Sequence, residues 1–155
     1  MSAIPVKELR KTLVEAGFEV FRVKDDEVHL AERQNLHLME AGVRVRASAP
    51  FRVTVTARAQ RSDAPGLTPE ALFELVRDGI KPLVEEGFEE LAVHTRELYS
   101  VSDSTQVVDI WYEVTLGRSF DAIHDAITFA RRALEIERYI VPTAVAAAQS
   151  TVRTS

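Results

Sequence analysis

The sequence contains no cysteine among its 155 residues, only six glycines, and no long apolar segment. Without cysteine the chain cannot form disulfides, cysteine-ligated zinc sites or iron–sulfur sites, and it cannot use a catalytic thiol. No apolar run approaches the ~20 residues that a membrane-spanning helix needs, and the first residues lack the apolar core of a secretion signal. These absences predict a cytoplasmic protein that does not enter the membrane.

Motifs for nucleotide or acyl-transfer chemistry are missing as well. The chain has no GxxxxGK[ST], GxGxxG or GxSxG segment, and its glycines are not clustered. The four histidines, His29, His37, His94 and His124, show neither HxxxH nor HxH spacing. The three consecutive acids at residues 25–27 are typical of a solvated turn, since the spacing of an EF-hand loop is absent. We therefore expect no catalytic residue, no metal site, no cofactor and no enzymatic activity.

Charge is distributed unevenly along the chain. Residues 1–62 carry eleven Lys/Arg and eight Asp/Glu, whereas residues 63–155 carry eight and sixteen, within a net charge of −5. This asymmetry can steer a partner or be neutralised inside the fold. A net negative charge argues against a dedicated nucleic-acid binder, because contacts to the many backbone phosphates dominate that affinity and usually leave a strongly basic footprint.

A short repeat organises the chain. The segment LVEAGFE at residues 13–19 recurs as LVEEGFE at residues 83–89. Each copy ends a helical pattern at a glycine, which suits the C′ position, and precedes an alternating, strand-like run. The repeat predicts two places where a helix gives way to a strand.

Three amphipathic helices are expected. The first covers residues 5–16, and the second begins at Pro69 with Thr68 as its N-cap and is kinked or broken near residues 78–82 by Pro82. The third covers residues 120–139 with Ser119 as its N-cap. Residues 141–155 are small and polar, and we expect a flexible C-terminal tail there.

Alternating apolar residues predict the strands. One hairpin is expected around residues 18–30, a second over residues 42–59, and a third from strands at about 88–99 and 106–116. Residues 31–42 are expected to be irregular. The prediction is an α+β protein with a single domain over residues 5–140, in which an antiparallel sheet of two main hairpins packs with three helices in the order α-β-β-β-β-α-β-β-α.

Two surfaces are candidates for partner binding. Alternation in residues 106–116 turns Val108, Ile110, Tyr112, Val114 and Leu116 inward and the only tryptophan, Trp111, outward. An outward tryptophan is either covered by a helix or is an anchor for a partner. The strands of residues 42–59 place four arginines on one face, which either pair with Asp109 and Glu113 or receive an acidic partner: Arg44, Arg46, Arg52 and Arg58.

The last predicted helix has two apolar stripes rather than one. The second stripe contains Phe129, Ala133, Ile136 and Ile140. Because one stripe is enough to pack against the sheet, the second predicts a homodimer interface.

The order of predicted elements resembles the YbjN family and the related type III secretion chaperone-like fold. The resemblance covers about residues 5–140 and is carried by segments such as ELRKTLVEAGFEVFRVKDDEV, GVRVRASAPFRVTVTARA and VVDIWYEVTL. It implies a small cytoplasmic bacterial protein, not an enzyme, that binds or chaperones other proteins and is often dimeric.

These patterns lead to two functional hypotheses. The first is a homodimeric chaperone or adaptor that binds a protein client, for which paired strands offer a surface for β-augmentation. The second is a small-molecule or anion-binding domain, perhaps enzymatic, with a pocket between sheet and helices near the arginines.

Overall fold

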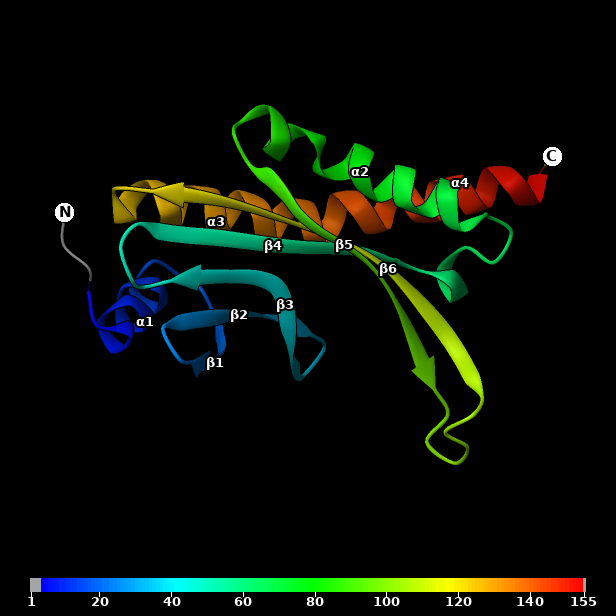
Figure 1. Cartoon of the computed structure of the whole chain (residues 1–155), viewed down its shortest axis with the longest axis horizontal. Coiled ribbons are helices and arrows are strands. Elements are labelled where there is room, and N and C mark those ends of the chain that lie inside the picture. The colour runs from blue at the N-terminus through cyan, green and yellow to red at the C-terminus, as the bar shows by residue number, and fades with distance from the viewer. Residues whose placement is uncertain (1–3, 155) are drawn as a thin grey trace. The chain divides into compact units, whose positions relative to one another are not determined.

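The protein has an α+β fold, as predicted (Figure 1). The computed structural model describes the backbone of residues 4–154 and the side chains of residues 4–149. The strands form a six-stranded antiparallel sheet in the order β1-β2-β3-β4-β6-β5. In chain order the elements are α1 (Val6–Glu15), β1 (Val20–Lys24), β2 (Glu27–Gln34), β3 (His37–Arg46), β4 (Phe51–Gln60), the 3₁₀ turn η1 (Arg61–Asp63), α2 (Pro69–Glu85), β5 (Glu89–Tyr99), β6 (Val107–Phe120), α3 (Ile123–Glu135), the π-turn η2 (Ile136–Ile140) and α4 (Val141–Thr154).

The chain divides into two compact units. The first contains the described residues up to Val55 together with Gly117–Glu135, and the second contains Thr56–Leu116 and the residues from Ile136 onward. Both β4 and β6 contribute residues to each unit. The single domain expected over residues 5–140 stays a prediction.

The first unit is built on strands β1 to β4 with helices α1 and α3. Helix α1 packs against β1 and β2, and α3 packs against β3. The core side chains alternate along the strands, because every second residue of a strand points to the same face. They include Leu9, Leu13, Val28, Leu30, Val43, Val45, Val53, Val55, Ala126 and Ala130.

The second unit combines strands β5 and β6 with helices α2 and α4. Helix α4 packs against α2, and Figure 1 shows the two helices side by side. Its core includes Leu72, Val76, Ile80 and Leu83 from α2 with Tyr112, Val114 and Leu116 from β6. Three of the five residues expected to point inward from β6 are therefore buried, while Ile110 is half-buried and Val108 is 53% exposed.

The two copies of the repeat end their helices in the same way. Gly17 has φ 98° and Gly87 has φ 102°, a left-handed conformation that other residues rarely adopt. In both copies the N–H of the next residue, Phe18 or Phe88, donates to the carbonyl of the leucine five residues earlier at 3.0 Å. This is a Schellman cap, and the buried phenylalanine and leucine pack beside it. The predicted helix-to-strand junctions are confirmed.

Residues 31–42 form a hairpin, so the expected irregular segment is wrong. Strands β2 and β3 are joined by a two-residue turn of Asn35 and Leu36, and Gln34 pairs with His37. Asn35 has φ 59°, which asparagine adopts more easily than most residues. Leu36 at the tip of the turn is 93% exposed. An apolar residue is not expected in an exposed turn, so the hydrophobic pattern did not indicate a turn here.

Helix α2 begins as predicted but does not break at its proline. Thr68 Oγ1 accepts a hydrogen bond from Ala71 N at 3.1 Å, and Pro69 is the first helical residue. Helix α2 continues through Pro82 to Glu85. Pro82 lacks only the N–H that would bond to the Asp78 carbonyl, and the helix continues for three more residues without that single hydrogen bond.

The start of the last predicted helix is corrected. Strand β6 extends to Phe120 and includes Ser119, so Ser119 is not an N-cap and α3 begins at Ile123. A π-turn at Ile136–Ile140 then leads into α4.

The expected flexible tail is instead helix α4 over Val141–Thr154. Val141 and Val145 are buried, and the buried Gln149 side chain accepts a hydrogen bond from Gly66 N at 3.2 Å. Close packing explains the helix: a Cβ built at Gly79 of α2 would lie 2.6 Å from Val141 Cγ2. The glycine in α2 therefore creates the space in which α4 packs.

Candidate functional site

The face of the first unit that carries the arginines is opposite to its core. Val43, Val45 and Val53 are buried, and the residues between them are half-exposed. Arg44 pairs with Thr54 across β3 and β4, and Arg46 pairs with Arg52. The arginines of β3 and β4 therefore lie on the face opposite to these buried valines.

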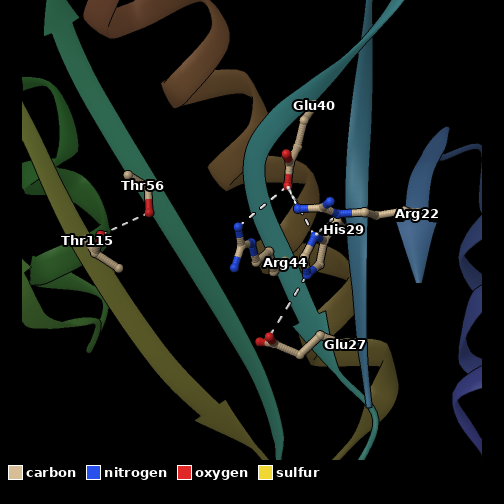
Figure 2. A network of polar contacts seen from close by, with 7 residues as sticks. All are labelled: Arg22, Glu27, His29, Glu40, Arg44, Thr56 and Thr115. Carbon is tan, nitrogen blue, oxygen red and sulfur yellow. Dashed lines mark hydrogen bonds and ion pairs between the residues drawn. The ribbon is translucent and has the colours of Figure 1, made fainter. Parts of the chain in front are cut away.

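One carboxylate, Glu40, is the shared partner of a histidine and two arginines on this face. Glu40 Oε1 lies 3.1 Å from His29 Nδ1, 3.5 Å from Arg44 Nη2 and 3.6 Å from Arg22 Nη2 (Figure 2). The side chains come from β1, β2 and β3, because Arg22 pairs with His29 and His29 with Arg44 along the sheet. Glu40 supplies the internal partner for Arg44. We call Arg22, His29, Glu40 and Arg44 the Glu40 cluster.

His29 is the buried member of the Glu40 cluster, with 1% of its surface exposed. Burial lowers its pKa below the usual 6.5, and Arg44 and Arg22 lower it further, while Glu40 and Glu27 act in the opposite direction. Its Nδ1 is also 3.1 Å from Arg22 Nε. Because Nδ1 of a neutral ring carries either a proton or a lone pair, it donates to Glu40 or accepts from Arg22, one at a time.

The carboxylates expected to pair with the arginine face have other partners in the second unit. Glu113 is 3.4 Å from Arg96 Nε, and Asp109 accepts hydrogen bonds from Ser62 Oγ at 2.6 Å and Ser62 N at 3.1 Å. Burial acts to raise the pKa of Asp109, but the hydrogen bonds from Ser62 and from Ile110 N outweigh it and lower the pKa.

Trp111 is on the predicted face but is not an open surface. Arg58 lies over its ring with Cζ 3.6 Å from the centroid, and Arg96 Cζ is 5.9 Å away. With the Gln60 amide oriented so that its oxygen accepts from Trp111 Nε1 at 3.3 Å, the amide nitrogen donates to Asp109 at 3.2 Å. The Trp111 ring is half-buried among these groups. Its ring face and its N–H therefore already have partners within the same unit.

The residues predicted for a dimer interface do not form one exposed stripe. Ala133 is fully buried and Ile136 is 6% exposed, so both pack inside the chain. Phe129 is half-buried and stacks on Phe120 with ring centroids 5.2 Å apart. Of the four, Ile140 is exposed, at 47%. The second stripe of the sequence is used for packing within the chain, since the π-turn and α4 follow it.

The surface that sequence reasoning missed is strand β5. None of its eleven residues is buried, although it pairs in the sheet with β6. Leu91, Val93 and Tyr99 are 44%, 40% and 50% exposed. A shallow hollow follows its second half, lined by His94, Thr95, Arg96, Glu97 and Tyr99. Hydrophobic alternation identified the strand, but its position at the sheet edge depends on strand order, which the pattern does not encode.

No group of three or more His, Asp or Glu side chains is arranged to hold a metal ion in the part of the chain that the structure describes. No helix of the described residues is long and apolar enough to cross a membrane. Comparison with protein-family models, with curated proteins and with solved structures found no match.

Proposed function

We propose that this protein is a non-enzymatic binding domain of chaperone or adaptor type, which holds an extended segment of a client protein along the edge of strand β5 and acts as a homodimer. The observation that supports this proposal is the exposure of β5, a long edge strand without a single buried residue. Its backbone donors and acceptors on the outer side provide the hydrogen bonds for one more strand.

The edge of β5 differs from the edges that proteins usually protect. Natural edge strands are short, bulged, covered, or carry proline or charged side chains, especially lysine, because an open edge pairs with other chains. Strand β5 has eleven residues with neither lysine nor proline, and it exposes Leu91 and Val93 on one face. A partner strand that alternates apolar and polar residues would cover these two side chains.

Charge selects the kind of segment that fits. The second unit contains thirteen Asp/Glu and seven Lys/Arg in the sequence, a net charge of −6. On β5 itself Glu89, Glu90 and Glu97 flank the apolar residues, and Glu90 is paired with Arg77 at 3.2 Å. We expect a client segment in which basic residues alternate with apolar ones, because opposite charges directly across a strand pair are favourable.

The homodimer in this proposal needs a surface other than the buried stripe. Tyr139 and Ile140 are adjacent in the π-turn and are 56% and 47% exposed. Both are exposed apolar residues that lie outside β5, and we propose them as a contact surface for a second copy.

A designed peptide tests the binding proposal. We would use a labelled peptide of about eight residues with alternating lysine and valine, the length of a typical strand, and its counterpart with glutamate in place of lysine. Fluorescence anisotropy should show saturable binding of the basic peptide and much weaker binding of the acidic one.

The chain offers a matched pair of variants for the same assay. Val93 on β5 and Val23 on β1 are both valines of edge strands, 40% and 38% exposed. Val93→Lys should weaken binding of the basic peptide at least about tenfold, equivalent to ~1.4 kcal/mol, whereas Val23→Lys should leave it unchanged. Equal loss in both variants, or binding of neither peptide to the unmodified protein, would contradict the proposal.

A further inference from the structure

Arg46 and Arg52 are arranged differently from their neighbours on the same strand face. They are direct partners across β3 and β4, so both side chains extend from the same face of the strand pair. Like charges directly opposite one another destabilise a strand pair unless another group compensates them. Two arginines in this register therefore need a counter-charge.

Within the described residues neither arginine forms an ion pair with a carboxylate at contact distance. Arg22 and Arg44 converge on Glu40, but no carboxylate lies within 4.0 Å of the Arg46 or Arg52 guanidinium nitrogens. Glu27 pairs with Arg46 along the backbone, yet its carboxylate is directed to His29, 4.0 Å from Nε2. Among the residues that the structure describes, the two guanidinium groups therefore have no ion-pair partner within 4.0 Å.

The hydrogen bonds of the two side chains are equally incomplete. Arg46 Nη2 donates to the Pro50 carbonyl at 3.2 Å, which fixes one branch of the guanidinium. The Nε atoms of Arg46 and Arg52 are both buried without an acceptor among the described residues. A buried donor without an acceptor costs free energy, and each side chain as a whole is half-exposed and reachable from solvent.

We infer that Arg46 and Arg52 form a binding site for a phosphate group. Two adjacent guanidinium groups without an ion pair match an anion that carries nearly two negative charges at neutral pH, whereas a carboxylate carries only one. Guanidinium groups present paired N–H donors that suit phosphate oxygens. Binding a phosphate between the two would remove their mutual repulsion. The site is independent of the proposed binding along β5, which belongs to the other unit.

Titration with inorganic phosphate tests this inference directly. The protein would be titrated at constant ionic strength while the Nε–Hε resonances of its arginines are followed by NMR, with sodium acetate as the carboxylate probe. We expect a saturable change at Arg46 and Arg52 with phosphate and a much smaller one with acetate. Changes of equal size with acetate would overturn the assignment to phosphate, and the absence of saturation would overturn the site.

Substitutions separate the site from general charge. Arg46→Gln and Arg52→Gln should each weaken phosphate binding at least about tenfold, whereas Arg44→Gln, on the same face but paired with Glu40, should change it less than about twofold. Unchanged binding in Arg52→Gln would refute the proposal.

Thermal unfolding with and without phosphate provides a second test, which also reports whether a variant is less stable. Without phosphate, Arg52→Gln removes the repulsion and should unfold at the same or a higher temperature than the unmodified protein. Phosphate should raise the unfolding temperature of the unmodified protein and of Arg52→Lys, which keeps the charge, but not that of Arg52→Gln. Equal stabilisation of all three proteins would overturn the proposal.

Discussion

The Glu40 cluster makes a quantitative prediction, because one carboxylate oxygen serves three partners. Glu40→Gln removes the negative charge but keeps an acceptor oxygen for His29 and the two arginines. The arginine side chains are 48% and 43% exposed and that of Glu40 is 31% exposed, so each ion pair is largely solvated. Such pairs contribute about 0–1 kcal/mol each.

We therefore expect Glu40→Gln to lower the free energy of unfolding by about 1 kcal/mol, the sum of two partly solvated ion pairs. Glu40→Ala also removes the acceptor beside the buried His29 ring, which adds about 1 kcal/mol for a lost hydrogen bond. The difference between the two variants separates the hydrogen bond from the charge.

Urea unfolding at neutral pH measures both values, with Glu90→Gln as the control. That substitution breaks one exposed pair with Arg77, whose side chains are 50% and 43% exposed, and should cost less than Glu40→Gln. The loss in Glu40→Gln should shrink in high salt, because exposed charges are screened. A loss no larger than that of Glu90→Gln, or one that salt does not change, would refute the role of Glu40 as the shared partner.

His29, Gly79 and Ile140 can each be tested by substitution. The pKa of His29 is below 6.5 in the folded protein, so the unfolded chain binds a proton first and the free energy of unfolding should fall as the pH falls from 6.5 toward the folded-state value; His29→Gln should flatten this pH dependence in urea titrations, and an unchanged slope would contradict it. Gly79→Ala gains helix propensity of about 1 kcal/mol but places Cβ against Val141, so thermal unfolding should show a net loss of up to ~2 kcal/mol that Val141→Ala partly rescues, whereas a stabilised single variant would argue against the packing of α4. Ile140→Asp should shift the proposed homodimer toward monomer in light scattering, and an unchanged dimer mass would exclude this surface.

Local signals in the sequence were sufficient for many of the elements. Thr68 caps α2, and Gly17 and Gly87 end their helices, as predicted. These features could be predicted because each depends on backbone geometry within a few residues. The turn at Asn35 was missed because an exposed leucine follows the asparagine, and apolar patterning assigns such a residue to the interior. Only the asparagine, which tolerates positive φ, indicated the turn.

The remaining differences come from contacts between residues distant in sequence. Helix α4 consists mostly of small and polar residues. Its packing depends on the space that Gly79 leaves on the surface of α2. The arginine face was identified by alternation, but Glu40 was in a segment expected to be irregular, so its role as the partner of Arg44 could not be seen. The exposure of β5 follows from strand order, which hydrophobic periodicity does not specify.

The central claim is that β5 accepts an additional strand from a client. Hydrogen exchange of the backbone amides of residues 89–99, followed by NMR with and without the basic peptide, tests it most directly. We expect the amides on the outer edge of β5 to become protected in an alternating pattern when the peptide binds, while those of β1 do not change. Protection elsewhere with no change in β5 would contradict it.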